Sequence, residues 1–163
     1  MKLAVRHLTA EKFMTSKVLC VTFAMTVEEV IQALLEHKIS GAPVIDQAQR
    51  LVSVVSESDL IRFAASGGLK KTLQTFESKL VPTAKLVWVL RTDPFALVFK
   101  KFLEHKVRRI LVTDGNGKVI GIISRSNVLR AFLESESKAV ADAAAEAAAS
   151  AVTDAPATKP KAS

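Results

Sequence analysis

The chain contains an internal repeat. The tetrapeptide Leu35–Lys38 recurs 68 residues later as Leu103–Lys106. At the same spacing, and without a gap, residues 14–63 align with residues 82–131 with 13 identities. Many of the other aligned pairs exchange one apolar residue for another. Because a duplicated unit decides how many structural modules a chain holds, we expect two copies of one small fold.

Both copies have the same predicted succession of elements. A short apolar strand is followed by a helix with apolar residues at helical spacing, then by two β-rich runs and a last helix. The first helix begins with a Thr26–Glu29 capping box in copy one, and with Asp93 as N-cap and Pro94 as first helical residue in copy two. The predicted strands are 18–22, 42–45 and 51–55 in the first copy, and 86–90, 110–113 and 119–123 in the second.

Turn residues separate the last two strands of each copy. In copy two the segment Asp114–Lys118 reads Asp-Gly-Asn-Gly-Lys, a strong hairpin signal. The final helices are predicted to begin near Ser58 and near Ser126. The order β-α-β-β-α, repeated, predicts an α/β fold, with a linker helix over 69–80.

The domain boundaries follow from the repeat. We expect repeat one over 1–67, repeat two over 68–135, and an Ala-rich, low-complexity tail over 136–163. A unit of about 60 residues buries too little surface to be stable alone, so the copies should pack together with pseudo-twofold symmetry and form two related clefts. The tail has high helix propensity but no apolar stripe, so we expect a frayed helix with a flexible end.

Composition indicates a globular, basic protein. The net charge is +7, and since the tail from Glu136 holds three lysines against four acidic residues, the body carries +8. Such a body attracts nucleic acid, an anionic membrane surface or a phosphorylated small molecule. No apolar run reaches the length of a membrane span, and the first residues lack a signal-peptide core, so we expect a cytoplasmic protein. The single cysteine, Cys20, reads as a buried strand residue.

Each copy resembles a cystathionine β-synthase (CBS) domain, and the resemblance covers about residues 3–133. The residues that carry the resemblance are 39–46 with 51–59, and 107–114 with 121–127. Paired CBS domains, also called Bateman modules, bind AMP, ADP, ATP, S-adenosylmethionine or related ligands in their clefts. They often form homodimers and regulate a partner protein. The resemblance therefore implies a non-enzymatic sensor of an adenine-containing ligand, with AMP, ADP or ATP favoured.

The main site is expected around Asp59. Ser56 and Ser58 lie at a strand-to-helix junction, where backbone N–H groups suit a phosphate, and the Asp59 carboxylate suits the two hydroxyls of a ribose. The resemblance gives Ser56 and Asp59 these roles. It also implies that Arg108 and Arg109 face this site from the other copy, although adjacent strand residues point to opposite faces and only one should reach the cleft. The adenine is expected near Thr15, Lys17 and Val18.

A weaker second site is expected around Asn127. Asn127 replaces the carboxylate with a neutral amide, so a ribose there lacks a charge-assisted hydrogen bond. The other residues predicted for this site are Ser40, Gly41, Thr83 and Ser124. Two further departures from the family pattern are Ser53, where glycine is usual, and Leu111, where proline is frequent.

Other interpretations remain open at this stage. Ser56 and Asp59 are also favoured helix-capping residues. His37 and His105 end helices beside lysines, where a cation favours the helix dipole, and nothing near them predicts a metal site. Trp88 and the phenylalanines of copy two are expected in the core. The alternative functions are an interaction module without ligand and, less favoured, a nucleic-acid-binding protein that uses the basic body. We expect the output to lie in a partner protein.

Overall fold

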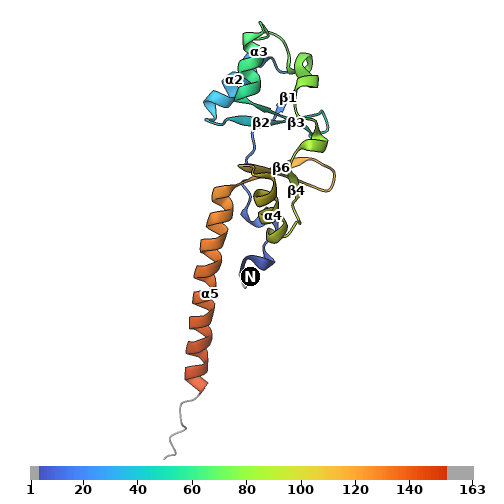
Figure 1. The fold of residues 1–163 in the computed structure, drawn as a ribbon. Coiled ribbons are helices and arrows are strands. Elements are labelled where there is room, and N and C mark those ends of the chain that lie inside the picture. Colours follow the sequence, from blue (N-terminus) through green and yellow to red (C-terminus); the bar gives the residue numbers. More distant parts are fainter. Residues whose placement is uncertain (1–3, 154–163) are drawn as a thin grey trace, which may run out of the picture.

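Each repeat folds into a three-stranded sheet with two helices (Figure 1). The computed structural model describes residues 4–153. The first repeat contains β1 (Val21–Thr22), α2 (Val27–Glu36), β2 (Gly41–Ile45), β3 (Leu51–Ser56) and α3 (Glu57–Ala65). The second contains β4 (Trp88–Leu90), α4 (Phe95–His105), β5 (Arg109–Thr113), β6 (Val119–Ser124) and α5 (Arg125–Thr153).

The two sheets have the same topology. Their strand orders are β1-β2-β3 and β4-β5-β6. In each, the first pair of strands is parallel and the second antiparallel. The helices lie on the outer faces, so the two sheets are stacked between them (Figure 1). The predicted order β-α-β-β-α, twice, and the α/β class are confirmed.

The first helices of the two repeats begin differently. Thr26 and Glu29 form the predicted capping box, with the Thr26 N–H donating to Glu29 Oε2 at 2.7 Å. In the second repeat the prediction of an Asp93 N-cap is wrong, because Pro94 occupies the N-cap position with an extended backbone. Asp93 instead accepts the Leu90 N–H at 2.9 Å, and the Phe95 N–H donates to the Leu8 carbonyl at 2.8 Å. A backbone carbonyl from the N-terminal segment thus replaces the side-chain cap.

The segments that precede the repeats pack on the opposite repeat. The N-terminal turns η1 (Ala4–His7) and α1 (Ala10–Phe13) contribute Val5 and Ala10 to the core of repeat two. The linker forms the 3₁₀ turns η2 (Leu73–Lys79) and η3 (Thr83–Lys85), where an α-helix over 69–80 was predicted. Its buried residues complete the core of repeat one: Leu73, Phe76 and Leu80. Each hydrophobic core therefore includes residues of the segment that precedes the other repeat.

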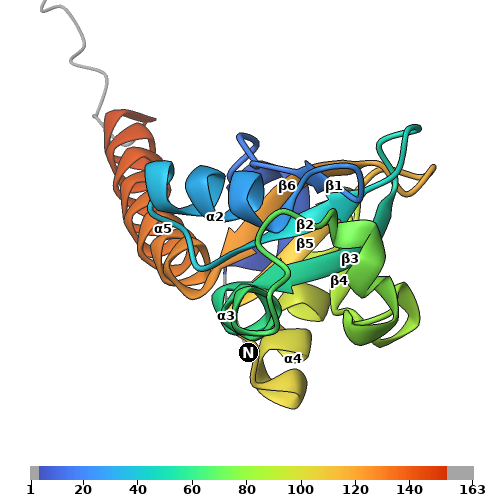
Figure 2. The same cartoon turned by 90° about the horizontal axis from the view of Figure 1, so that it is seen from above.

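The hairpin turns tie the two sheets together. The Leu51 N–H donates to the Gly117 carbonyl at 3.0 Å, and the Val119 N–H donates to the Gln49 carbonyl at 3.3 Å. The two turns lie side by side at the end of the sheets farthest from α2 and α5 (Figure 2). The predicted turn at Asp114–Lys118 is confirmed, with Gly117 at φ +81°. These bonds fix one edge of the contact between the repeats.

The aromatic core of repeat two is confirmed except for one residue. Phe95 and Phe102 are buried, and Phe99 packs against them. Trp88 was predicted in the core but is 39% exposed. It stands beside buried Val89 in β4, where successive side chains point to opposite faces. Because Val89 faces the helix-covered core, Trp88 lies on the opposite face of the sheet.

The last helix continues through the Ala-rich segment. α5 runs without interruption to Thr153 and projects from the body of the molecule (Figure 1). The flexible end predicted for the tail falls on residues 154–163, which lie outside the described residues. Over residues 4–153, no helix combines the length and apolar character that crossing a membrane requires.

Candidate functional site

A pocket of about 380 Å³ opens between the two repeats. Repeat one supplies the start of β2, the end of β3 and the first turn of α3. Repeat two supplies β5, β6 and the segment that leads into β4. The lining is mostly apolar, and its residues are Ser40, Gly41, Ala42, Pro43, Val54, Ser56, Asp59, Val81, Lys85, Leu86, Val87, Val107, Arg109, Leu111 and Ile122.

Ser56 and Asp59 form a reciprocal cap at the start of α3. The Asp59 N–H donates to Ser56 Oγ at 3.3 Å, while Asp59 Oδ2 accepts the Ser56 N–H at 2.9 Å and the Ser56 hydroxyl at 2.5 Å. The other carboxylate oxygen, Oδ1, pairs with Arg62 one turn along the helix. The capping interpretation is therefore correct, and the same two residues line the pocket. Ser58 is exposed and is not among the lining residues.

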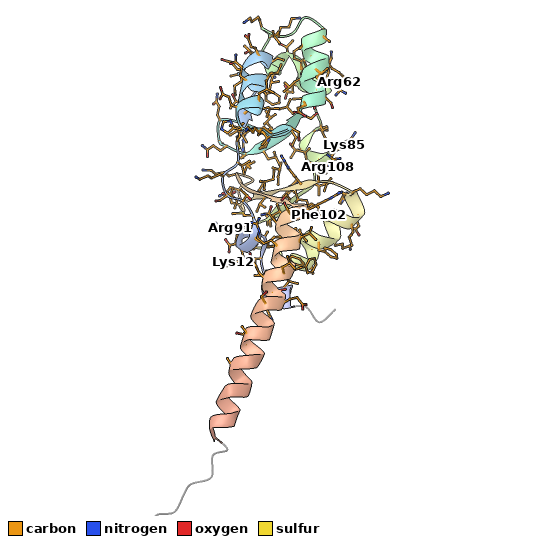
Figure 3. The ribbon with its side chains drawn as sticks, turned by 90° about the vertical axis from the view of Figure 1, so that its left-hand side faces the viewer. Lys12, Arg62, Lys85, Arg91, Phe102 and Arg108 are labelled. Carbon is orange, nitrogen blue, oxygen red and sulfur yellow. The ribbon has the colours of Figure 1, made fainter. Side chains whose placement is uncertain are left out.

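Two cationic side chains line the pocket from the second half of the chain. Arg109 comes from the first residue of β5, and Lys85 from η3. Arg108 does not line it, which agrees with the expectation that only one of the adjacent arginines reaches the cleft. Arg62, Lys85 and Arg108 follow one another along the same side of the molecule (Figure 3). The pocket thus combines one carboxylate with two positive charges and apolar walls.

Two partly buried hydrogen bonds hold the segment that carries Lys85. The Ser53 hydroxyl donates to the Val81 carbonyl at 2.8 Å, and the Thr83 hydroxyl donates to the Val52 carbonyl at 2.6 Å. Both bonds tie the linker to β3. Ser53, which stands where the resemblance leads us to expect glycine, is 3% exposed and pairs with Val44 next to a shift in the strand register. This contact positions the pocket and was not foreseen from the sequence.

Gly41 brings β2 close to β3 at the mouth of the pocket. A Cβ atom at this position would lie 2.8 Å from the Val55 carbonyl oxygen, a distance that real side chains do not adopt. Any other residue would push the strands apart beside Ser56. Glycine is therefore required here for close packing of the backbone.

The structure groups the predicted site residues differently from the prediction. Ser40 and Gly41, expected at the second site, line the Asp59 pocket. Thr15, Lys17 and Val18, expected beside Asp59, do not line it. Thr83, also expected at the second site, binds β3 of repeat one.

The observed groups differ from the predicted ones because each connecting segment packs on the repeat opposite to the one that it precedes. Because the N-terminal segment packs on repeat two, Thr15 lies beside Asn127 and pairs with Ile122 through backbone hydrogen bonds of 2.9 Å. The linker packs on repeat one, so Lys85 and Leu86, the repeat-related counterparts of Lys17 and Val18, reach the Asp59 pocket. Whether the residues brought together there bind a ligand stays a prediction.

Asn127 reproduces the cap of Asp59 without its charge. Its Oδ1 accepts the Ser124 N–H at 2.9 Å and the Ser124 hydroxyl at 2.6 Å. Its Nδ2 points to the Thr15 hydroxyl at 3.5 Å. The two repeats therefore begin their last helices with the same capping contacts. They differ in that Asp59 carries a negative carboxylate and Asn127 a neutral amide.

Cys20 and His37 lie in structural surroundings. Cys20 is half-buried, and burial raises the pKa of its thiol, which disfavours the nucleophilic thiolate. His37 ends α2 with Nδ1 3.0 Å from the Ala33 carbonyl oxygen, a structural role. Within residues 4–153, no three His, Cys, Asp or Glu side chains cluster closely enough to hold a metal ion.

Comparison with known proteins gives a consistent result. A family model described as CBS domain matches residues 10–66 and 78–134. The chloroplastic CBS domain-containing protein CBSX1 of Arabidopsis thaliana is 36% identical over 152 residues, which cover 77% of this chain and 64% of that protein. The chain thus spans less than two thirds of the length of this relative.

Solved structures show the same fold. The crystal structure of Arabidopsis thaliana CBSX2 in complex with AMP has a TM-score of 0.62 and 33% identity, and covers 77% of this chain and 96% of that one. Protein MJ1004 of Methanocaldococcus jannaschii has a TM-score of 0.70 and 26% identity, and covers 78% of this chain and 60% of that one. Both the pair of repeats and their arrangement are thus found in known proteins.

Proposed function

Because this chain belongs to the CBS domain family, we propose that it is a regulatory module that binds an adenine nucleotide between its two repeats. One observation carries the proposal: the pocket between the repeats combines the Asp59 carboxylate with Lys85 and Arg109 and with apolar walls. A nucleotide has the matching parts, namely a diol, an anionic phosphate and a flat apolar base. AMP is the first candidate, since CBSX2 was crystallised with it.

Each part of the nucleotide has a chemical counterpart in the pocket. The ribose hydroxyls donate to Asp59, whose carboxylate already lies at the rim and is only 15% exposed. The phosphate pairs with Lys85 and Arg109, because a guanidinium and an ammonium are the side chains best suited to phosphate oxygens. The base packs against the apolar wall formed by residues such as Val54, Leu86 and Ile122.

The proposed role is regulatory and not catalytic. The side chains that line the pocket offer charges and apolar surface, and they include no paired nucleophile and base. A bound nucleotide contacts both repeats, so it favours the relative arrangement of the repeats that closes the pocket. A partner protein, which remains to be identified, would read that arrangement. ADP, ATP and S-adenosylmethionine are the alternative ligands.

Thermal unfolding with a panel of ligands tests the proposal. We expect AMP, ADP or ATP at about 100 times its dissociation constant to add roughly 2.7 kcal/mol of stability. The shift should disappear in Asp59→Ala and persist in Asn127→Ala, its matched control in repeat two. A folded protein that no adenine ligand stabilises would contradict the proposal and favour an interaction module.

A further inference from the structure

The loop between α4 and β5 gathers positive charge that the equivalent loop of repeat one lacks. Residues 105–109 read His-Lys-Val-Arg-Arg, and the repeat-related residues 37–41 read His-Lys-Ile-Ser-Gly. Arg125, at the start of α5, has the acidic Glu57 as its counterpart. We call residues 105–109 together with Arg125 the basic loop, and its four cations are Lys106, Arg108, Arg109 and Arg125. Three of these four are therefore specific to repeat two.

The two loops leave their helices in the same way but differ in what holds them. Lys106 and its counterpart Lys38 both have a positive φ of 51°. In repeat two, the Arg125 guanidinium donates to the carbonyls of Val107 and Lys106 at 3.0 and 3.2 Å. These bonds fix a further positive charge against the loop, so its cations form one cluster.

The cations of the basic loop are not neutralised within the part of the chain that the structure describes. All four are exposed, and none takes part in an ion pair there. The acidic residue next to the loop, Glu104, pairs with Lys100 at 3.6 Å. Like charges held close together repel one another, so a bound anion stabilises such a cluster.

A nucleotide in the pocket would use only one of these charges. Arg109 lines the pocket, whereas Lys106, Arg108 and Arg125 do not. Arg108 lies on the same side of the molecule as the pocket residue Lys85 (Figure 3). The basic loop therefore extends from the pocket to the outer surface, and three of its cations are left for an anion other than the nucleotide.

The size of the cluster favours an acidic protein segment over a nucleic acid. Duplex-binding proteins that make about 6–10 phosphate contacts spread their cations along the DNA backbone. The basic loop instead holds its four cations on one short loop and the first residue of α5. A run of Asp and Glu residues is flexible and can place several carboxylates around so compact a cluster.

We propose that the basic loop binds an acidic segment of a partner protein, and that a nucleotide in the pocket weakens this binding. Complementary charges of this kind speed the encounter and fix the orientation of two proteins. The coupling rests on the proposed function: the phosphate that pairs with Arg109 adds negative charge to the loop and so reduces its attraction for carboxylates. The acidic segment itself needs no nucleotide to bind.

Fluorescence anisotropy with a labelled oligoglutamate peptide tests this surface. We expect the wild-type protein to bind the peptide at low salt. Lys106→Glu combined with Arg108→Glu should weaken binding about tenfold or more, because attraction becomes repulsion. The control combines Lys12→Glu with Lys38→Glu, which changes the net charge equally and alters the counterpart of Lys106. This control should weaken binding by less than about threefold, because distant charges are screened.

Three results would overturn the assignment. The first is a folded wild-type protein that does not bind the peptide at low salt. The second is an equal loss in both double variants, which would mean that the peptide responds to net charge alone. The third is a short DNA duplex that binds more tightly than the peptide and is released by Lys106→Glu with Arg108→Glu, which would assign the loop to nucleic acid.

AMP separates this proposal from the nucleotide proposal. Saturating AMP should weaken peptide binding to the wild type about threefold or more. AMP that binds in calorimetric titration without any effect on the peptide would overturn the coupling. A protein that binds the peptide but not AMP would contradict the nucleotide site, and with it the coupling, but not the basic loop.

Discussion

The hydroxyl of Ser56 donates to the carboxylate of Asp59 over 2.5 Å, and the amide N–H of Asp59 donates back to the same hydroxyl. These two residues thus cap α3 and line the pocket at once. The cap uses Oδ2 twice and Arg62 occupies Oδ1, so the carboxylate has little acceptor capacity left for a ribose. Ligand binding at this site must therefore exchange one of the existing contacts.

Arg62 is the contact most easily exchanged. Its side chain is 66% exposed, and an exposed ion pair contributes only about 0–1 kcal/mol. We expect Arg62→Gln to raise the affinity for uncharged adenosine by up to about fivefold, measured by calorimetric titration. Arg130→Gln, the repeat-related change beside Asn127, should have no effect. Weaker adenosine binding by Arg62→Gln would show that Arg62 supports the site and does not compete for it.

Asp59→Asn should separate the cap from the ligand site. Asn127 performs the same capping contacts with a neutral amide, so the variant should lose less than about 1 kcal/mol of stability in urea unfolding. A loss above about 2 kcal/mol would mean that the charge of Asp59 is essential to the fold, and that its variants cannot report on binding alone.

Lys85 and Arg109 should recognise the phosphate. Lys85→Ala and Arg109→Ala are each expected to weaken AMP binding about tenfold or more, since a hydrogen bond to a charged group contributes about 1.5–3 kcal/mol. Adenosine binding should change by less than about threefold. Lys17→Ala, the repeat-related control outside the pocket lining, should bind AMP like the wild type. Equal losses for AMP and adenosine would place these side chains elsewhere on the ligand.

Thr113 offers a test of the core that does not involve the site. Its hydroxyl is buried without a hydrogen-bond partner in the described part of the chain, and the residue is 2% exposed. Thr113→Val should raise the free energy of unfolding by about 1 kcal/mol, because an unpaired buried hydroxyl is destabilising. Ser53→Ala, which removes a bonded hydroxyl, should lower it by a similar amount. Destabilisation by Thr113→Val would indicate a partner for the hydroxyl.

Local chemistry explains which features were predictable. The Thr26–Glu29 box and the Asp114–Lys118 turn depend on residues a few positions apart, and both are confirmed. The partners of the connecting segments depend on contacts between distant parts of the chain. Nothing near Thr15 or Thr83 in the sequence indicates that each packs on the opposite repeat, so the sequence analysis grouped residues that the fold separates.

The same limit explains the second repeat. Leu8 satisfies the N–H group at the start of α4 from 87 residues away, and no propensity rule connects it with Pro94. The Lys85 wall was also missed, although the 68-residue spacing relates Lys85 to Lys17. Lys85 follows from that spacing only once it is known that the segment before each repeat packs on the other repeat.

Calorimetric titration of AMP into the wild type and Asp59→Asn tests the central claim most directly. We expect one AMP per chain for the wild type and an affinity at least tenfold weaker for Asp59→Asn, with the loss coming from a charge-assisted hydrogen bond. Undiminished binding by Asp59→Asn, or no binding of AMP by the folded wild-type protein, would contradict the assignment of the pocket between the repeats as an AMP site.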